Sequence, residues 1–455
     1  MSGMFATFKN AFKIAELRTK LIYTLIILIL YRLGASIPVP FIDSATMQKL
    51  FSSQGDTIFG YLNILSGDAF SKATLFALSI SPYITSSIVM QLLTIAIPAL
   101  EKLQKSGDDG RKKITQITRY VTVALGLITG YGYYMTCRYT YHIVSNQTFF
   151  AGIIIVACYS AGSALIMWLG EKINENGIGN GISMILFANI ISRVPSSAVN
   201  QIRTIIDSIQ DPTKGAGDVL WQIGVSLLVV VVALIIIAFV VYMSNAERRI
   251  PVQYSKRVVG RKMYGGQSTY LPMKVNMSGV MPIIFASSIS SIFPTVISFM
   301  NKNPNGRAPL QADQPYLYFF YNLFGTRSAV YIILEFVLIL AFSYFYISIS
   351  FNPLEVSNNL MKNGGFIPGI RPGKPTTEFI TKILNRIVLI GGLFLGVIAV
   401  FPLILNALAA AFNLGTLGAI AFGGSSLLIV VGVALETTKE IEAQMTMRHY
   451  KGFLE

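Results

Sequence analysis

The sequence predicts an all-α protein that crosses a membrane several times, and three observations support this fold class. Of the 455 residues, 53% are hydrophobic and 13% are charged, whereas soluble domains carry about 25% charged residues. Apolar segments near the roughly 20 residues that a spanning helix needs recur along the chain. Lysines and arginines gather in alternate connections between these segments, which is typical of polytopic membrane proteins.

Five predicted spans occupy the N-terminal half, residues 21–200. Before them, Met1–Lys20 is a basic arm with apolar residues at helical spacing, which predicts an amphipathic helix at the membrane surface. Glu101–Arg119 is a charged loop, and Gly170–Gly181 is rich in Gly and Asn, which predicts a turn rather than a helix. The expected spans are 21–37, 73–98, 120–141, 149–169 and 182–194.

Five more spans occupy the C-terminal half, residues 219–435, which follows a polar hinge loop at 201–218. Two long charged loops, 244–274 and 350–386, interrupt this half, and a charged tail, 436–455, follows it. The expected spans are 219–243, 278–300, 329–349, 387–408 and 417–435. Ten spans place both termini on one side, and the basic residues of the long loops assign that side to the cytoplasm.

A short internal similarity suggests that the two halves are related. Ser81-Pro82 is followed by Ser86-Ser87-Ile88, and Met281-Pro282 is followed by Ser287-Ser288-Ile289, at matching places in the two halves. Because five spans is an odd number, the halves would be inverted relative to each other, as in many transport proteins. A chance similarity is the alternative.

The segment Thr57–Ser66 is apolar but only about half the length of a spanning helix. The span behind it, 73–98, carries many hydroxyl or amide side chains, which lipid disfavours; they include Ser79, Ser81, Thr85, Ser86, Ser87 and Gln91. We interpret this span as the lining of a cavity or helix seam, with the short segment folded back into the cavity. In the alternative interpretation, the short segment lies on the membrane surface and the hydroxyls bond their own helix.

Several kinds of chemistry lack a signature in this sequence. There is no P-loop and no His-Glu-x-x-His motif, and Cys137 and Cys158 both lie in apolar segments. We therefore expect no catalysis, no cofactor and no metal. Arg32 and Glu335 lie near span ends, where we expect them to reach toward the interface. A secondary transporter for a small solute remains an alternative, although such transporters place ionisable groups near the bilayer midplane.

Six short motifs are distributed over almost the whole chain. They are Ile37–Ile42 (IPVPFI), Phe76–Ile84 (FALSISPYI), Glu247–Tyr254 (ERRIPVQY), Tyr270–Gly279 (YLPMKVNMSG), Asn363–Gly373 (NGGFIPGIRPG) and Gly423–Ile429 (GGSSLLI). Together these motifs resemble the SecY channel family, the central subunits of the bacterial protein translocase. One departure is Asp68, where the family pattern leads us to expect a second glycine after Gly67, so the packing of this end of the short segment is open.

The resemblance implies two pseudo-symmetric inverted halves around a central hourglass pore with an aliphatic constriction. The matching constriction residues are Ile80, Ile84, Leu186, Ile190, Ile284 and Ile429. The short segment would be a plug, made of Thr57, Ile58, Phe59, Gly60, Tyr61, Leu62, Asn63, Ile64, Leu65 and Ser66. A lateral gate toward lipid would include Ser81, Thr85, Ser86, Ser87, Gln91, Asn276, Ser287 and Ser288.

The resemblance also implies partners and a location. The chain would pass secretory polypeptides with their signal peptides across the bacterial cytoplasmic membrane and release membrane segments into its lipids. SecE and SecG would be the small partner subunits, and the SecA motor ATPase or ribosomal RNA would dock on the basic loops. The matching docking residues are Arg248, Arg249, Lys256, Arg257, Arg371 and Tyr450.

Overall fold

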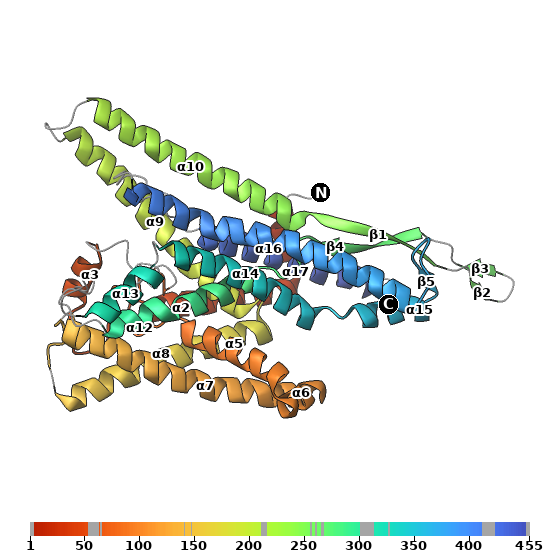
Figure 1. Ribbon diagram of the computed structural model, residues 1–455, viewed down its shortest axis with the longest axis horizontal. Helices are drawn as coiled ribbons and strands as arrows, with labels where there is room; N and C mark the ends of the chain where they lie inside the picture. Colours follow the sequence, from red (N-terminus) through yellow and green to blue (C-terminus); the bar gives the residue numbers. More distant parts are fainter. Residues whose placement is uncertain are drawn as a thin grey trace.

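Long helices lie side by side and form the body of the molecule, while a narrow β-hairpin projects from one end (Figure 1). The computed structural model describes residues 4–52, 63, 66–140, 142–146, 148–210, 216–254, 257–259, 262–264, 268–300, 314–325, 328–411 and 424–451.

The first half contains the helices α1 (Met4–Lys13), α2 (Ala15–Gly34), α3 (Ser44–Ser52), α5 (Ser81–Ala96), α6 (Pro98–Lys105), α7 (Asp108–Met135), a π-helical turn (Thr136–Thr140), α8 (Phe149–Asn176) and α9 (Gly181–Gln210). The second half contains α10 (Ala216–Asn245), α11 (Met281–Ser290), α12 (Ile292–Met300), α13 (Pro315–Phe324), α14 (Ala329–Ser350), α15 (Pro353–Lys362), α16 (Lys374–Ala411) and α17 (Gly424–Lys451).

The helices confirm a multi-pass membrane protein. Among the described residues, five helices are long and apolar enough to cross a bilayer, and a sixth candidate is the pair α5 and α6, which is bent by 101°. The remaining predicted spans coincide with α2, α7, α11 with α12, and α17, so ten spans are consistent with the structure and their number stays a prediction.

The glycines at 170 and 181 were wrongly interpreted as turn formers. Helix α8 continues to Asn176, so only residues 177–180 form the turn before α9. The physical reason is close packing: a Cβ on Gly181 would lie 1.9 Å from the carbonyl oxygen of Gly170. These glycines let two helix backbones approach, a role that composition alone does not distinguish from a turn.

Three other boundaries differ from prediction. The second span does not begin at Ala73, because residues 73–80 form turns and Pro82 lies in the first turn of α5, where its missing N–H costs nothing. Most of the Glu101–Arg119 loop is helical, in α6 and α7. The hinge loop is shorter than 201–218, because α9 runs to Gln210 and α10 begins at Ala216.

The charged segments near the chain ends also fold as helices. The arm Met1–Lys20 is divided at Ile14: α1 precedes it, and α2 begins at Ala15 as part of the first long helix. Ala11 of α1 is fully buried in a cluster with Leu17 and with Ile441 of α17, so α1 packs on protein rather than lying free on a surface. The tail is helical as far as Lys451.

The loop 244–274 contains strands, which the all-α prediction omitted. β1 (Glu247–Tyr254) pairs antiparallel with β4 (Ser268–Lys274), and β5 (Gly365–Phe366) pairs with the other edge of β1. Two further short strands, β2 (Arg257–Val259) and β3 (Lys262–Tyr264), lie farther out along the hairpin (Figure 1). Alternate residues of β1, Ile250 and Val252, are buried, as expected for a strand with one face on a core.

We predict that the substitution Gly162→Ala destabilises the helix bundle. A Cβ on Gly162 would lie 2.0 Å from the backbone carbonyl oxygen of Leu75, and relieving such a clash costs about 1–3 kcal/mol. Gly224→Ala in α10 is the matched control, because its Cβ would meet open space. Thermal unfolding of the purified protein in detergent should show a lower midpoint for the first variant only. Equal midpoints would contradict this packing.

Candidate functional site

Six aliphatic side chains meet in the interior of the bundle. They come from the start of α5 (Ile80, Ile84), from α9 (Leu186, Ile190), from α11 (Ile284) and from α17 (Ile429), and none is more than 5% exposed. All six belong to one continuous cluster of buried apolar side chains. The structure therefore brings together four helices that are distant in the sequence at one apolar centre.

Two helices with a proline in their first turn, α5 and α11, position part of this centre. Helices α5 and α11 each begin one residue before a proline, Pro82 or Pro282, and each is preceded by a buried aliphatic residue, Ile80 or Val280. The amides of Ile84 and Ile284 donate to the carbonyls of those preceding residues at 3.1 and 3.2 Å. The short sequence similarity between the halves thus corresponds to equivalent helix starts, and α5 packs directly against α11.

A centre of this kind is a barrier to water and ions. Branched alkyl groups offer no hydrogen bonds, so a hydrated ion would lose its water shell there without compensation. The same surfaces form no directional bonds, and they can therefore close around side chains of many shapes. Within the described part of the chain, no group of three or more His, Cys, Asp or Glu residues is placed to hold a metal ion.

Three of the serines predicted for the lateral gate bond within α11 or to α7 rather than across the contact between α5 and α11. Ser287 and Ser288 both donate to the Ile284 carbonyl of their own helix, at 3.2 and 2.7 Å, and Ser86 donates to Thr118 of α7 at 2.8 Å. The contact between α5 and α11 depends instead on the apolar cluster that both helices enter. The other predicted gate residues, Ser81, Thr85, Ser87, Gln91 and Asn276, are half-buried.

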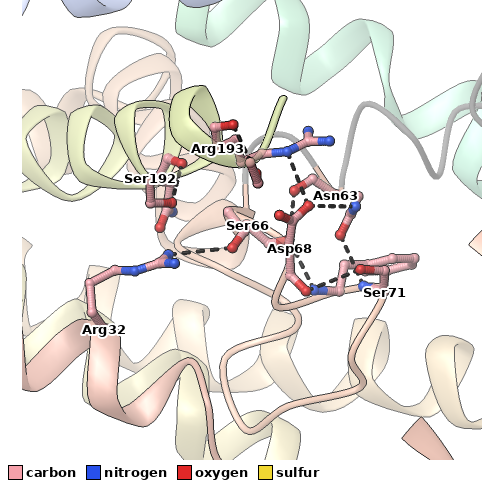
Figure 2. Close-up of polar contacts among 11 residues, drawn as sticks. Arg32, Asn63, Ser66, Asp68, Ser71, Ser192 and Arg193 are labelled. Atoms are coloured by element: carbon pink, nitrogen blue, oxygen red, sulfur yellow. Dashed lines mark hydrogen bonds and ion pairs between the residues drawn. The ribbon is translucent and has the colours of Figure 1, made fainter. Parts of the chain in front are cut away.

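A polar loop lies against α9, the helix that carries Leu186 and Ile190 of the apolar centre, and Figure 2 shows its polar contacts. The Asp68 carboxylate forms an ion pair with Arg193 Nε of α9 at 3.0 Å. It also accepts a hydrogen bond from Asn63 Nδ2 at 3.0 Å. Asn63 Oδ1 in turn accepts from the backbone amide of Ser71 at 2.9 Å. The packing at Asp68, which the sequence left open, is thus settled for this residue: its charge is paired with Arg193.

Of the ten predicted plug residues, only Asn63 and Ser66 are among the described residues.

The two ionisable residues near span ends do not reach toward the interface. Arg32 Nη1 donates to the carbonyl of Gly67 at 3.3 Å (Figure 2). Glu335 is only 5% exposed on α14. Both predictions of snorkelling are therefore wrong, because each side chain turns into the protein rather than along the helix surface.

The basic residues of the hairpin are exposed. Arg248 and Arg249 lie on β1, and Arg249 pairs with Glu247 at 2.7 Å while its guanidinium lies 5.1 Å from the ring centre of Tyr270. Lys256 lies outside the described residues. Arg257 and Tyr450 have described backbones, in β2 and α17, but their side chains do not belong to the described part.

Arg371 is exposed at a turn that hydrogen bonds hold in place. Thr376 Oγ1 donates to the Arg371 carbonyl at 2.9 Å, and Ser357 Oγ donates to the Gly373 carbonyl at 3.1 Å. Gly369 and Gly373 have φ of 82° and 99°, values that favour glycine over other residues. The arginine is therefore presented from a fixed backbone rather than from a free loop.

The hairpin base adjoins the pore helix α17. Burial lowers the pKa of Lys439 on α17, and the positive charge of Lys274 at the end of β4 lowers it further. Burial likewise raises the pKa of Glu436, one turn earlier, and Glu440 raises it further. Lys439 and Glu436 of α17, the helix that carries Ile429, therefore lie within electrostatic range of Lys274 at the base of the hairpin.

Sequence reasoning missed Arg193 and Asn189 as parts of the site. A Cβ on Gly67 would lie 2.9 Å from Asn189 Oδ1, so the polar loop sits directly on α9 next to Ile190. The available signal was Asp68 itself: an acid beside a membrane segment requires a cation, and Arg193 is the basic residue near the end of the fifth span.

This helical architecture is that of protein-conducting channels. It superimposes with a TM-score of 0.64 on the structure titled "The structure of a protein conducting channel", at 17% identity, covering 94% of this chain and 92% of that one. The structure titled "Sec61 in the Canine ribosome-channel complex from the endoplasmic reticulum" gives 0.60 at 16% identity over the same shares.

The chain belongs to the SecY family. The SecY family model matches residues 74–438. The protein translocase subunit SecY of Streptomyces coelicolor is 43% identical over 465 residues, covering 99% of this chain and 100% of that protein. The subunit of the same name from Mycobacterium tuberculosis H37Rv is 41% identical over 464 residues, with the same coverage.

Proposed function

We propose that this chain is the channel through which unfolded secretory polypeptides cross the bacterial cytoplasmic membrane, and from which transmembrane segments leave sideways into lipid. The observation that carries the proposal is the single apolar centre built by helices from both halves of the chain. Membership of the SecY family supports it, and so does a fold shared with a structure in which "the plug domain" of SecY is described as maintaining "a membrane seal".

The six aliphatic residues act as the constriction of the pore. In the resting channel they contact one another and exclude water. A passing chain displaces these contacts and replaces them with its own side chains, so that the barrier to ions persists around the polypeptide. No step in this process requires a cofactor or a covalent intermediate.

Lateral release takes place between α5 and α11. The two helices pack against each other within the apolar cluster, and their hydroxyls remain bonded inside or beside their own helix. Parting such helices breaks mainly the van der Waals contacts of the apolar cluster. A hydrophobic segment in the pore can therefore enter the bilayer here.

Energy for transport comes from partners on the cytoplasmic face. Both termini, the β1–β4 hairpin and the Arg371 turn face the cytoplasm, as the positive-inside rule requires. SecA or the ribosome docks on this face, where exposed arginines attract phosphate or acidic groups. SecE and SecG complete the complex, and precursor signal peptides and membrane lipids are its other partners.

The small-solute alternative has no support from the relatives and structures described above, which are translocase subunits and protein-conducting channels. Asp68 is also ion-paired with Arg193, so it is not a free charge that such a transporter could use as a relay.

We predict that Ile84→Ser or Ile429→Ser makes the resting channel leak ions. Each change removes a buried alkyl group worth about 2 kcal/mol and introduces a hydroxyl that favours water, so efflux should rise on the order of tenfold. Ile390→Ser, on the exposed surface of α16, is the control. Ion efflux from proteoliposomes measures the effect. Leaks no larger than those of the control would argue against the constriction.

We predict that Arg371→Glu lowers the rate of motor-driven transport about tenfold or more. The arginine projects from a fixed turn, so a reversed charge meets the partner at a defined place. Lys374→Glu is the matched control, since it makes the same charge change three residues away. The measurement is ATP-dependent uptake of a precursor by inverted vesicles containing SecA. If the Arg371 variant took up the precursor as well as the wild type does, the proposed role of Arg371 in docking would be wrong.

A further inference from the structure

Two arginines from different helices fasten the loop 66–71 next to the constriction (Figure 2). Arg193 of α9 pairs with the Asp68 carboxylate at 3.0 Å, and Arg32 of α2 donates to the Gly67 carbonyl at 3.3 Å. The loop is thus attached at two adjacent residues to two helices that are distant in sequence.

Asp68 occupies a backbone conformation that suggests a reason for its presence. Its φ is 69°, in the left-handed region where glycine fits without cost and most other residues do not. Aspartate tolerates this region better than most residues, but it gains nothing there from the backbone alone. Its carboxylate, however, receives Arg193 and Asn63 together. The side-chain contacts compensate for the strained backbone.

The attachment lies one helical turn from the constriction. Arg193 follows Ile190 by three residues on α9, and Gly67 lies against Asn189 in the preceding position. Asn63 extends the attachment backward along the chain, because it bonds both Asp68 and the backbone of Ser71. A movement of α9 that widens the constriction therefore pulls on this loop.

We propose that the Asp68–Arg193 ion pair is a latch that holds the loop 66–71 on α9 while the channel is closed, and that it must break when the channel opens. The inference rests on the proposed function, and specifically on residues 57–66 being the plug to which this loop connects. Both side chains are about one-quarter exposed, so water can reach the charges as they separate and the latch is reversible.

The test is a double-mutant cycle with Asp68→Asn and Arg193→Gln, measured as ion efflux from proteoliposomes. Asparagine keeps the tolerance of the left-handed backbone and removes only the charge. Each single variant should raise efflux about three- to tenfold, and the double variant should leak no more than the leakier single variant. Lys72→Gln, a charge removal in the adjoining loop, is the control and should leave efflux unchanged. The latch would be overturned if each single variant leaked no more than the wild type. It would also be overturned if the increase in efflux of the double variant equalled the product of the two single increases.

Asp68→Gly separates the latch from a role in folding. Glycine relieves the backbone at φ 69°, so this variant should unfold at the same or a higher temperature and still leak. A variant that is less stable but no leakier would show that Asp68 is structural only, which would overturn the proposal.

Deleting residues 57–62 distinguishes failure of the latch from failure of the plug. The deletion leaves Asn63, Ser66 and Asp68 in place. It should raise efflux beyond that of the latch variants, and Asp68→Asn should add nothing to it. If the deletion leaks but the latch variants do not, the latch alone is wrong. If the deletion does not leak, the plug assignment is wrong and the latch falls with it.

Discussion

Dehydration of six aliphatic side chains at the centre of the bundle is the interaction on which the rest of this structure depends. Ile80, Ile84, Leu186, Ile190, Ile284 and Ile429 are all at least 95% buried in one cluster, and burying each contributes on the order of 2 kcal/mol. The contact is non-directional, so it can be broken and remade without leaving unpaired polar groups. Other features of the fold serve to bring these side chains together: prolines that start α5 and α11 at equivalent places, and glycines that let α8 and α9 approach closely.

The same centre is mechanically connected to the exposed basic end of the molecule. The turn between α8 and α9 is tied to α17, because Gly179 N–H donates to Glu440 at 3.0 Å, and to α2, because Ile178 N–H donates to Thr24 Oγ1 at 3.1 Å. Helix α17 carries Ile429 inward and adjoins Lys274 at the hairpin base. The strand residue Ile250 shares a second cluster with Ile367 and Ile380, beside the Arg371 turn. Under the proposed function, a partner that displaces the hairpin would act on helices that enter the apolar centre.

Sequence patterns predicted the membrane-spanning class and the family, because hydropathy and motif identity are local properties. They failed where tertiary contact decides. Gly170 and Gly181 resemble turn residues until their backbones are seen to touch. The helix after Pro195 carries exposed Val199, Ile202, Ile206 and Ile209 at helical spacing, a pattern that the surrounding polar residues obscured. Arg193 lies 125 positions from Asp68 along the chain, and only the fold brings them together.

The central claim is that a polypeptide in transit passes between these six side chains. A photo-reactive residue placed at each position in turn, with a precursor arrested by a folded C-terminal domain, tests it directly. Cross-links to the precursor from positions on all four helices, and none from Ile390 on the outer surface of α16, are the result the account predicts. A precursor that cross-links at Ile390 but at none of the six positions would place the translocating chain outside the apolar centre and contradict it.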